Sequence, residues 1–162
     1  MNYYELFDLP VSPSVDQKLV AKKYIELQRK SHPDFYQNAL ENEKEEVMLH
    51  SAEINKGYKI LKDPQLTIEY FLITKGAIQT DEKYSLPPDF LMEMMDLNEL
   101  MLEKGGSDVT EKVKTFEDSI FGSVRHLLQS TTVEWSEEDL QKLKEYYYKK
   151  KYLERILDRL DE

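Results

Sequence analysis

The residues whose types could support chemistry lie closest together at positions 31–34, which read Ser-His-Pro-Asp. Serine, histidine and an acidic residue are the groups of hydrolytic triads, in which the imidazole activates the hydroxyl. Here His32 and Asp34 flank a proline, so one substrate atom need not lie within reach of both. Ser31 has neither the strained turn nor the glycine-rich loop that builds an oxyanion hole. We therefore interpret His32-Pro33-Asp34 as a recognition motif and expect no catalysis by this chain.

The composition excludes most other reactive centres. The 162 residues contain no cysteine, which rules out disulfides, cysteine-ligated zinc or iron–sulfur clusters and a cysteine nucleophile. The histidines at 32, 50 and 126 are widely separated, so a histidine-rich metal site is not expected. The sequence also contains no phosphate-binding loop and no dinucleotide fingerprint. It therefore predicts neither a cofactor nor a bound metal.

The charge of the chain argues against nucleic acid as a partner. Thirty-two acidic and 22 basic residues give a net charge of −10, whereas phosphate binding needs a basic face. Tyrosines at 146–148, followed by lysines at 149–151, have the composition of a single-strand binding platform. Consecutive residues of one helix point in different directions, however, so these tyrosines cannot form one stacking surface. We expect no nucleic-acid partner.

The start of the chain gives no sign of export. Residues 1–5 carry no basic cluster, and no long apolar run follows them, so no secretory signal is predicted. No window approaches the roughly 20 apolar residues of a membrane span. The sequence predicts a protein of the bacterial cytoplasm without membrane contact.

The elements that must position the His-Pro-Asp motif are predicted to be helices. Asp16 is a suitable helix cap, and Pro33 disfavours helical geometry in the residue before it, so a helix is expected between them. A second helix is expected over 41–61. Its apolar stripe consists of Val47, Met48, Ser51, Ile54, Tyr58 and Leu61. Short helices near 3–7 and over 66–74 complete this half, and the motif lies in the connection of an antiparallel helical hairpin. A plain alternative is that Pro33 ends a helix and Asp34 caps the next turn.

The second half is predicted to be a three-helix bundle. A segment with a glycine and a double proline, residues 76–88, is interpreted as a connection. One helix follows over 89–104, a second begins near residue 107 and carries its apolar stripe as far as Leu127, and a third extends from a capping box at Ser136 to about Leu160. The chain is therefore predicted to be all-α, with one domain at 1–75 and another at 89–162.

The helix before the motif is basic in an otherwise acidic chain. Over residues 16–30 five cations oppose two carboxylates, which gives a net charge of +3. The cations are Lys18, Lys22, Lys23, Arg29 and Lys30. A basic helix is usually only a solvated face. Beside an exposed polar loop, it favours an electrostatic docking surface.

Taken together, the hairpin, the basic helix and the motif resemble a J-domain. Residues 1–10, 27–34, 51–55, 69–72 and 90–97 further resemble HscB, the J-type co-chaperone family of iron–sulfur cluster assembly. The resemblance implies an L-shaped molecule with an N-terminal J-domain and a C-terminal bundle. It also implies that an HscA-type chaperone of the DnaK class binds the basic helix and the loop and is stimulated to hydrolyse ATP. The residues implied are His32, Pro33, Asp34, Lys22, Lys23, Arg29 and Lys30.

The first helix of the bundle carries more apolar side chains than its core requires. Phe90, Met94, Leu97 and Met101 share one helical stripe and make a sufficient core. Three further residues, Leu91, Met92 and Met95, fall to one side of this stripe, beside Asp96, Glu99 and Glu103. Methionine adapts to varied partners, and an apolar centre with an acidic rim suits a partner that carries Lys or Arg.

The HscB resemblance implies that this surface binds the scaffold protein IscU. The residues implied are Leu91, Met92, Met95, Asp96, Glu99 and Glu103, with Tyr152 from the last helix. Met95 and Tyr152 replace other apolar or aromatic types, and Asp96 is a shorter carboxylate than the usual Glu. At the loop, Ser31 stands where an aromatic residue is common. Phe35 stands where Lys is frequent, so we expect weaker electrostatic steering of the chaperone with the mechanism intact.

These observations lead to a hypothesis with two alternatives. The leading hypothesis is an adaptor that stimulates the ATPase of a DnaK-class chaperone and delivers IscU to it. A general J-type folding co-chaperone, without preference for IscU, is the first alternative. A structural helical module that no longer uses its tripeptide is the second. The sequence leaves open whether the chaperone is a dedicated HscA or the general DnaK.

Overall fold

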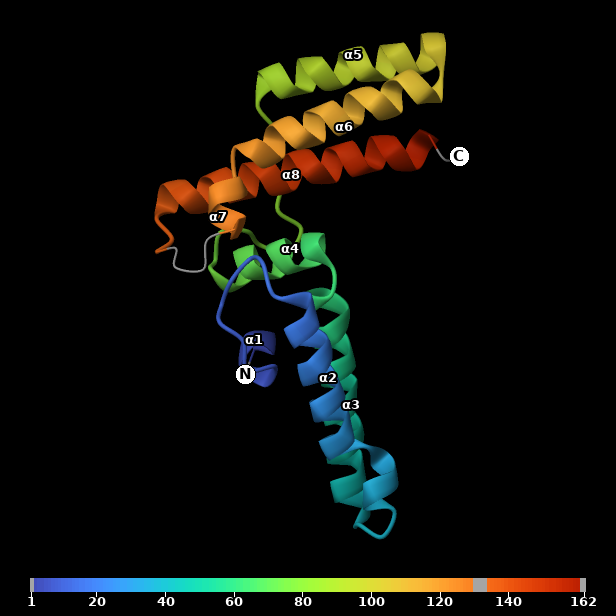
Figure 1. Cartoon of the computed structure of the whole chain (residues 1–162), viewed down its shortest axis with the longest axis vertical. Coiled ribbons are helices and arrows are strands. Elements are labelled where there is room, and N and C mark those ends of the chain that lie inside the picture. The colour runs from blue at the N-terminus through green and yellow to red at the C-terminus, as the bar shows by residue number, and fades with distance from the viewer. Residues whose placement is uncertain (1, 130–133, 161–162) are drawn as a thin grey trace. The chain divides into compact units, whose positions relative to one another are not determined.

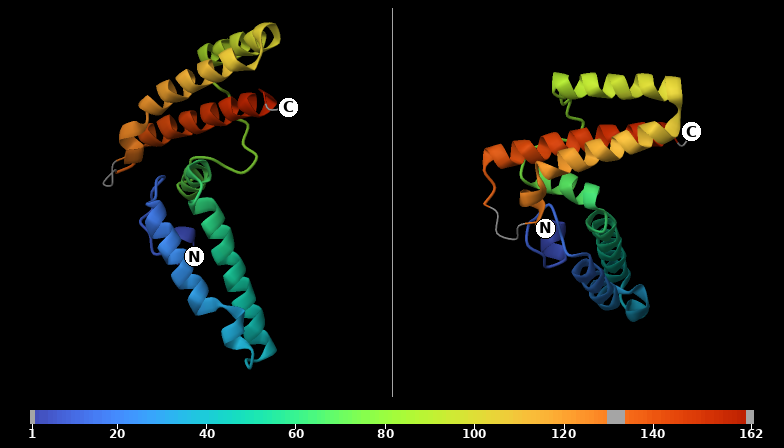
Figure 2. Two further views of the ribbon diagram at one scale, coloured as in Figure 1. Left: turned by 45° about the vertical axis from the view of Figure 1, so that its right-hand side comes forward. Right: turned by 45° about the horizontal axis from the view of Figure 1, so that its top comes forward.

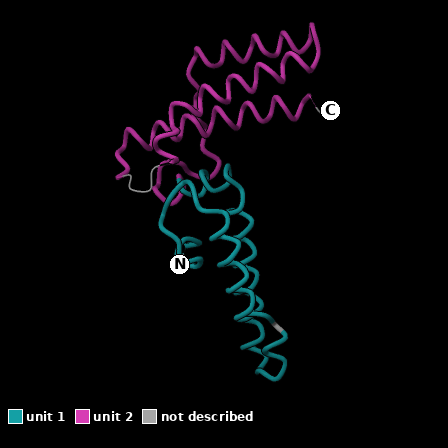
Figure 3. Tube along the Cα trace, in the orientation of Figure 1, with its two compact units in different colours: residues 1–71 teal, residues 72–162 magenta. Residues whose placement is uncertain are grey.

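The computed structural model describes residues 2–129 and 134–160, and within these residues every regular element is a helix and there is no strand (Figures 1 and 2). The predicted all-α fold class is thus confirmed. The chain divides into two compact units, Met1–Phe71 (unit 1) and Leu72–Glu162 (unit 2), shown in Figure 3. The ends of the predicted domains at residues 1 and 162 lie outside the described residues. Within those residues, no helix is long and apolar enough to cross a membrane.

Unit 1 is built around a helical hairpin. Its elements are α1 (Tyr3–Leu6), α2 (Gln17–Ser31), the 3-10 helix η1 (Pro33–Tyr36), α3 (Glu41–Leu61) and most of α4 (Pro64–Thr74). The N-terminal end of α2 meets the C-terminal end of α3, where the Gln17 side-chain amide donates to the carbonyl oxygen of Leu61 over 3.0 Å. The two long helices therefore run antiparallel, as predicted.

The bounds of α2 follow from its terminal residues. The Asp16 carboxylate accepts from the backbone N–H groups of Lys18 and Leu19, which satisfies two of the free donors at the start of the helix. The helix ends at Ser31 because His32, the residue before Pro33, adopts extended backbone angles. Both predicted bounds are confirmed.

The core of unit 1 joins the short α1 to the hairpin. Tyr4 and Phe7 from the N-terminal segment pack with Val20, Ile54 and Leu61, and all five are almost completely buried. On α3 the predicted apolar stripe needs one correction. Met48 is 62% exposed. The other stripe residues recur three or four positions apart, whereas Met48 directly follows Val47 and is turned about 100° away from them.

Unit 2 contains the predicted bundle. Its helices are α5 (Pro88–Lys104), α6 (Gly106–Gly122), α7 (Arg125–Gln129) and α8 (Glu137–Leu160). Helix α6 packs against both α5 and α8. The core is made by Phe90, Met94, Leu97, Val109, Val113, Leu153 and Ile156, with Met101 partly buried against it. The apolar stripe predicted on the first bundle helix is therefore confirmed as core.

One predicted helix of unit 2 is interrupted. The stripe was expected to continue from Val109 to Leu127, but α6 ends at Gly122 and α7 begins at Arg125. The Ser123 hydroxyl donates to the Ile120 carbonyl oxygen over 2.6 Å and so competes with the helical hydrogen bonds. Leu127 still reaches the core at 3% exposure. The capping box at Ser136 is confirmed: the Asp139 N–H donates to the Ser136 hydroxyl and the Ser136 N–H to the Asp139 carboxylate.

Candidate partner-binding sites

His32 and Asp34 of the His-Pro-Asp motif are exposed at a corner directly after α2. The His32 imidazole Nδ1 accepts a hydrogen bond from the backbone N–H of Asp34 over 3.2 Å and lies 3.4 Å from the Asp34 carboxylate. His32, and not Asp34, therefore caps η1, which corrects the plain alternative for this loop. Because Nδ1 accepts, the neutral ring carries its proton on Nε2, which is left as a donor. Both side chains are more than half exposed.

The cations of α2 differ in their exposure and in whether they form ion pairs. Lys22, Arg29 and Lys30 are exposed, and none of them forms an ion pair within the described residues. Lys23 is instead paired with Asp8, with 3.3 Å between Nζ and Oδ2, and its side chain is only 26% exposed. Lys23 therefore contributes less positive potential to the surface than the sequence alone suggests. Three of the four predicted cations remain available to an acidic partner.

Polar contacts across the hairpin fix which face of α2 points outward. The Tyr24 hydroxyl and the Gln28 side-chain amide both donate to the Asn55 amide oxygen, each over 2.8 Å. Ser51 donates to Gln28, and the Tyr24 ring stacks on Tyr58 with 4.0 Å between ring centroids. Sequence reasoning did not assign this role to Asn55. The signal that could have found it is the polar pair at 51 and 55, one turn apart on a helix that also carries the apolar stripe.

The second predicted site is the outer face of α5. Leu91, Met92 and Met95 are 39%, 64% and 63% exposed, and the neighbouring Asp96, Glu99 and Glu103 are exposed as well. Tyr152 of α8 is only partly exposed, because its ring packs edge-on against Phe90 with centroids 6.2 Å apart. The structure thus brings Tyr152 beside the start of α5, where it can form the margin of this face but not its centre.

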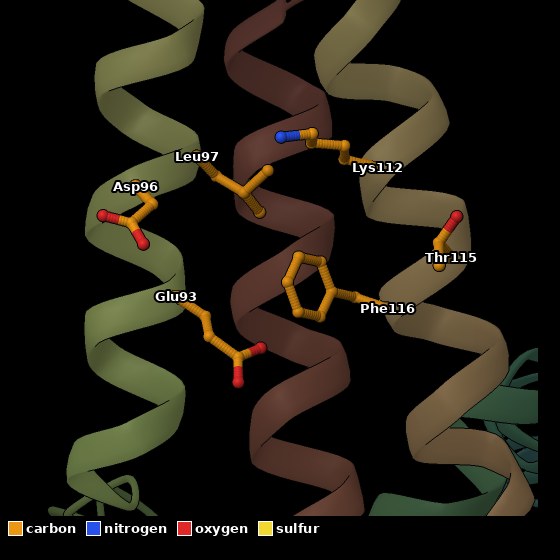
Figure 4. A pocket seen from close by; sticks show the side chains of 6 residues that line it. All are labelled: Glu93, Asp96, Leu97, Lys112, Thr115 and Phe116. Carbon is orange, nitrogen blue, oxygen red and sulfur yellow. The ribbon is translucent and has the colours of Figure 1, made fainter.

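A groove between α5 and α6 separates one of the predicted scaffold-binding residues from the exposed apolar ones. Its base is formed by Leu97 and Phe116, and its edges carry Glu93 and Asp96 on α5 and Lys112 and Thr115 on α6, around a volume of ≈ 310 Å³ (Figure 4). At about 100° per residue, Leu91 and Met95 lie on the side of α5 away from this groove. Asp96 therefore borders the groove, whereas the exposed apolar side chains lie beyond it. The groove depends on α6 packing, which the α5 sequence does not show.

The three lysines at 149–151 interact with side chains of unit 2. Lys149 lies 3.8 Å from the Glu145 carboxylate, Lys150 lies 3.2 Å from that of Glu117, and Lys151 lies over the Tyr147 ring. These partners lie in different directions around α8. The basic run therefore contributes to packing of the bundle.

Comparison with known proteins gives consistent relatives. Residues 86–161 match the family model described as the HSCB C-terminal oligomerisation domain. The chain is 33% identical to a co-chaperone protein HscB homolog of Vibrio cholerae serotype O1, over 99% of each chain. A homolog from Shewanella pealeana is 34% identical, over 99% of this chain and 95% of the relative.

Solved structures agree with these sequence relatives. The crystal structure of human co-chaperone protein HscB superimposes with a TM-score of 0.81 and 27% identity, over 99% of this chain and 81% of the other. The chaperone HscB from Vibrio cholerae gives a TM-score of 0.59 and 31% identity, over 99% of both chains. A helical hairpin with an exposed His-Pro-Asp corner, joined to a helical bundle, defines a J-type co-chaperone. The chain belongs to the HscB family, whose members assist iron–sulfur cluster assembly.

Proposed function

We propose that the chain is an adaptor between an HscA-type chaperone of the DnaK class and the iron–sulfur scaffold protein IscU. Unit 1 binds the chaperone and stimulates its ATPase, and unit 2 carries the scaffold to it, so that clusters are matured and transferred. The observation that carries the proposal is the exposure of His32 and Asp34 beside three cations that form no ion pair within residues 2–129 and 134–160, in a chain of the HscB family.

The hairpin acts on the chaperone through polar contacts. The Nε2 donor of His32 and the carboxylate of Asp34 are presented together by the short hydrogen-bonded turn. Lys22, Arg29 and Lys30 attract an acidic chaperone surface and raise the rate of encounter. The chain changes the conformational equilibrium of its partner and itself carries out no catalysis, because hydrolysis takes place in the ATP site of the chaperone.

The bundle offers the scaffold an adaptable apolar face. Met92 and Met95 are each more than 60% exposed and lie about one helical turn apart, and contiguous exposed apolar surface marks interaction sites. Their thioethers adapt to the shape of a partner, and Asp96, Glu99 and Glu103 complement basic side chains at the rim. The proposed centre of the contact is Leu91, Met92 and Met95, with Tyr152 at its margin.

The steady-state ATPase rate of the cognate chaperone tests the proposal. It is measured with this protein, with IscU and with both. We expect stimulation by both together to exceed the sum of the two separate effects, because trigger and client arrive on one molecule. His32→Gln and Asp34→Asn should abolish the effect while the circular dichroism spectrum stays unchanged. No stimulation by the folded wild-type protein would contradict the proposal.

A second candidate is a general J-type folding co-chaperone. It is favoured by the same exposed methionines, which also suit unfolded segments of varied sequence. It predicts that a denatured model client replaces IscU with equal effect in the ATPase assay. A preference for IscU of tenfold or more in the concentration needed for half-maximal synergy would exclude it.

A further inference from the structure

The hairpin tip exposes apolar surface that its own fold does not use. Phe35 is 72% exposed and Ile25 is 49% exposed, and neither belongs to the core of unit 1. Together they line a shallow groove of ≈ 450 Å³ on the outer face of α2. The groove is lined by Tyr24, Ile25, Gln28, Arg29, His32 and Phe35. The groove thus extends from the His-Pro-Asp turn along α2, and His32 is part of both the turn and the groove.

The groove is held in shape from both ends. Tyr24 and Gln28, which form its inner wall, are hydrogen bonded to Asn55 of α3. At the other end the Tyr36 hydroxyl donates to the Lys30 carbonyl oxygen over 3.2 Å and fastens η1 to the end of α2. The edge of one ring of the His32–Phe35 pair faces the other, with 6.2 Å between centroids. A partner therefore meets a largely preformed surface and loses little free energy in ordering it.

The chemistry of the groove defines what fits it. Ile25 and Phe35 provide an apolar centre, whereas Arg29 lines the groove and Lys22 and Lys30 are exposed on the same helix without ion pairs in the described part of the chain. An apolar centre with a cationic margin is complementary to an apolar side chain flanked by carboxylates. A partner surface with carboxylates alone would contact the cations at the margin and leave the ring of Phe35 without a contact.

We propose that this groove is a second part of the chaperone-docking surface, in which Phe35 anchors an apolar side chain of the chaperone that is flanked by carboxylates. The inference rests on the proposed function, because the occupant is the same chaperone that contacts His32 and Asp34. It gives Phe35 a positive role in affinity, where its lack of charge alone would predict only weaker steering. Burial of an aromatic ring depends little on salt, so a part of the affinity should persist at high ionic strength.

Substitutions at Phe35 separate the two views. The concentration of this protein that gives half-maximal ATPase stimulation is measured for wild type, Phe35→Ala and Phe35→Lys at low and high salt. We expect Phe35→Ala to raise that concentration about tenfold or more at both salts, as for an aromatic anchor of an interface. Phe35→Lys should also weaken binding at high salt, despite its added positive charge. Stronger binding by Phe35→Lys at both salts would overturn the inference.

Controls keep the inference distinct from the proposed function. Leu102 is 87% exposed on α5 of unit 2, so Leu102→Ala removes exposed apolar surface elsewhere and should leave the half-maximal concentration unchanged. Maximal stimulation by Phe35→Ala at saturation should equal that of wild type, since Asp34 is intact. If wild type stimulates, Asp34→Asn does not, and Phe35→Ala behaves as wild type, the groove is not used although the proposed function stands. If the wild-type protein does not stimulate the ATPase, both the proposed function and the inference about the groove are wrong.

Discussion

At the scale of single residues, Gly57 shows how closely α1 is packed against the hairpin. A Cβ atom at this position would lie 2.8 Å from Tyr3 Cδ1 and 2.9 Å from Phe7 Cε1, and Phe7 is fully buried. Gly57→Ala gains up to about 1 kcal/mol of helix propensity. It must also displace α1, at about 1–3 kcal/mol for overpacking. We expect a net loss of about 1–2 kcal/mol in the free energy of unfolding, measured by urea denaturation with circular dichroism.

Gly122 provides the matched control for this substitution. It is the last residue of α6, and apart from its chain neighbours and its own helix backbone no described atom lies within 4 Å of an added Cβ. Gly122→Ala should therefore leave stability unchanged or raise it by up to about 1 kcal/mol. Equal free energies of unfolding for Gly57→Ala and Gly122→Ala would contradict the close packing of Tyr3 and Phe7 against Gly57 of α3.

At the two candidate sites, the sequence predicts those features that depend only on residues nearby in the chain. Pro33 ends α2 and places a polar turn between two helices, and Met92 and Met95 fall outside a stripe that already supplies the core. Contacts between distant residues could not be predicted in this way. Lys23 meets Asp8 across 15 residues and Tyr24 meets Asn55 across 31. Such pairs depend on how the helices are rotated about their axes, which the helical period alone does not determine.

At the scale of elements, both bounds of α2 and the start of α8 followed from capping residues and a proline, because these act locally. The interruption between α6 and α7 did not, because the apolar period continues across it. Val124 and Leu127 are both buried although they lie beyond the break. Burial therefore favoured one uninterrupted helix, whereas the hydrogen bonds from the Ser123 hydroxyl and N–H to the Ile120 carbonyl oxygen, and from the Val124 N–H to that of Phe121, mark the break.

Lys144 and Tyr148 of α8 hold residues 77–84, and Lys144 makes two of the hydrogen bonds. The Lys144 ammonium donates to the Ala77 carbonyl oxygen over 3.0 Å and to the Glu82 carboxylate over 2.8 Å, and its side chain is only 11% exposed. The Tyr148 hydroxyl also donates to Glu82. Lys144→Met keeps the apolar stem but leaves both oxygens without this donor. We expect the attachment to weaken by about 1–3 kcal/mol, seen as faster hydrogen exchange in residues 77–84.

The pKa of Glu82 gives the same interaction a second readout. The hydrogen bond from Lys144 lowers this pKa below its usual value; partial burial opposes the shift, and the Tyr148 hydroxyl adds to it. A lowered pKa means that the carboxylate stabilises the fold above about pH 4.3, and that this contribution is lost as the pH falls through the lowered value. In Lys144→Met the pKa should rise, as followed by carbon NMR of the Glu82 carboxyl group. Lys142→Met, which removes an exposed pair with Glu138, should leave it unchanged.

At the scale of the whole molecule, the two candidate surfaces lie on different units of one chain. Residues 1–80 carry a net charge of −2 and residues 81–162 carry −8, so the acidic surplus belongs to the half that holds the proposed scaffold surface. The three cations of the proposed chaperone surface that form no ion pair in the described part of the chain lie on α2. This separation allows each surface to be disabled without disturbing the other. It could be predicted from the sequence, since it follows from the placement of charges along the chain.

The value of having both surfaces on one chain can be measured by mixing two full-length variants. Asp34→Asn retains the scaffold surface and lacks the trigger, and Met92→Asp/Met95→Asp retains the trigger and lacks the scaffold surface. Because both methionines are exposed, the double variant should fold as wild type. A covalent connection raises the effective concentration of client at the chaperone to the millimolar range, far above that of separate proteins in the assay. We therefore expect the mixture to show only the stimulation of the methionine variant alone, without the synergy of scaffold and trigger. Restored synergy would mean that the two surfaces can act on different chains, for example in a mixed oligomer, and the ATPase rate at several concentrations of the mixture distinguishes these outcomes.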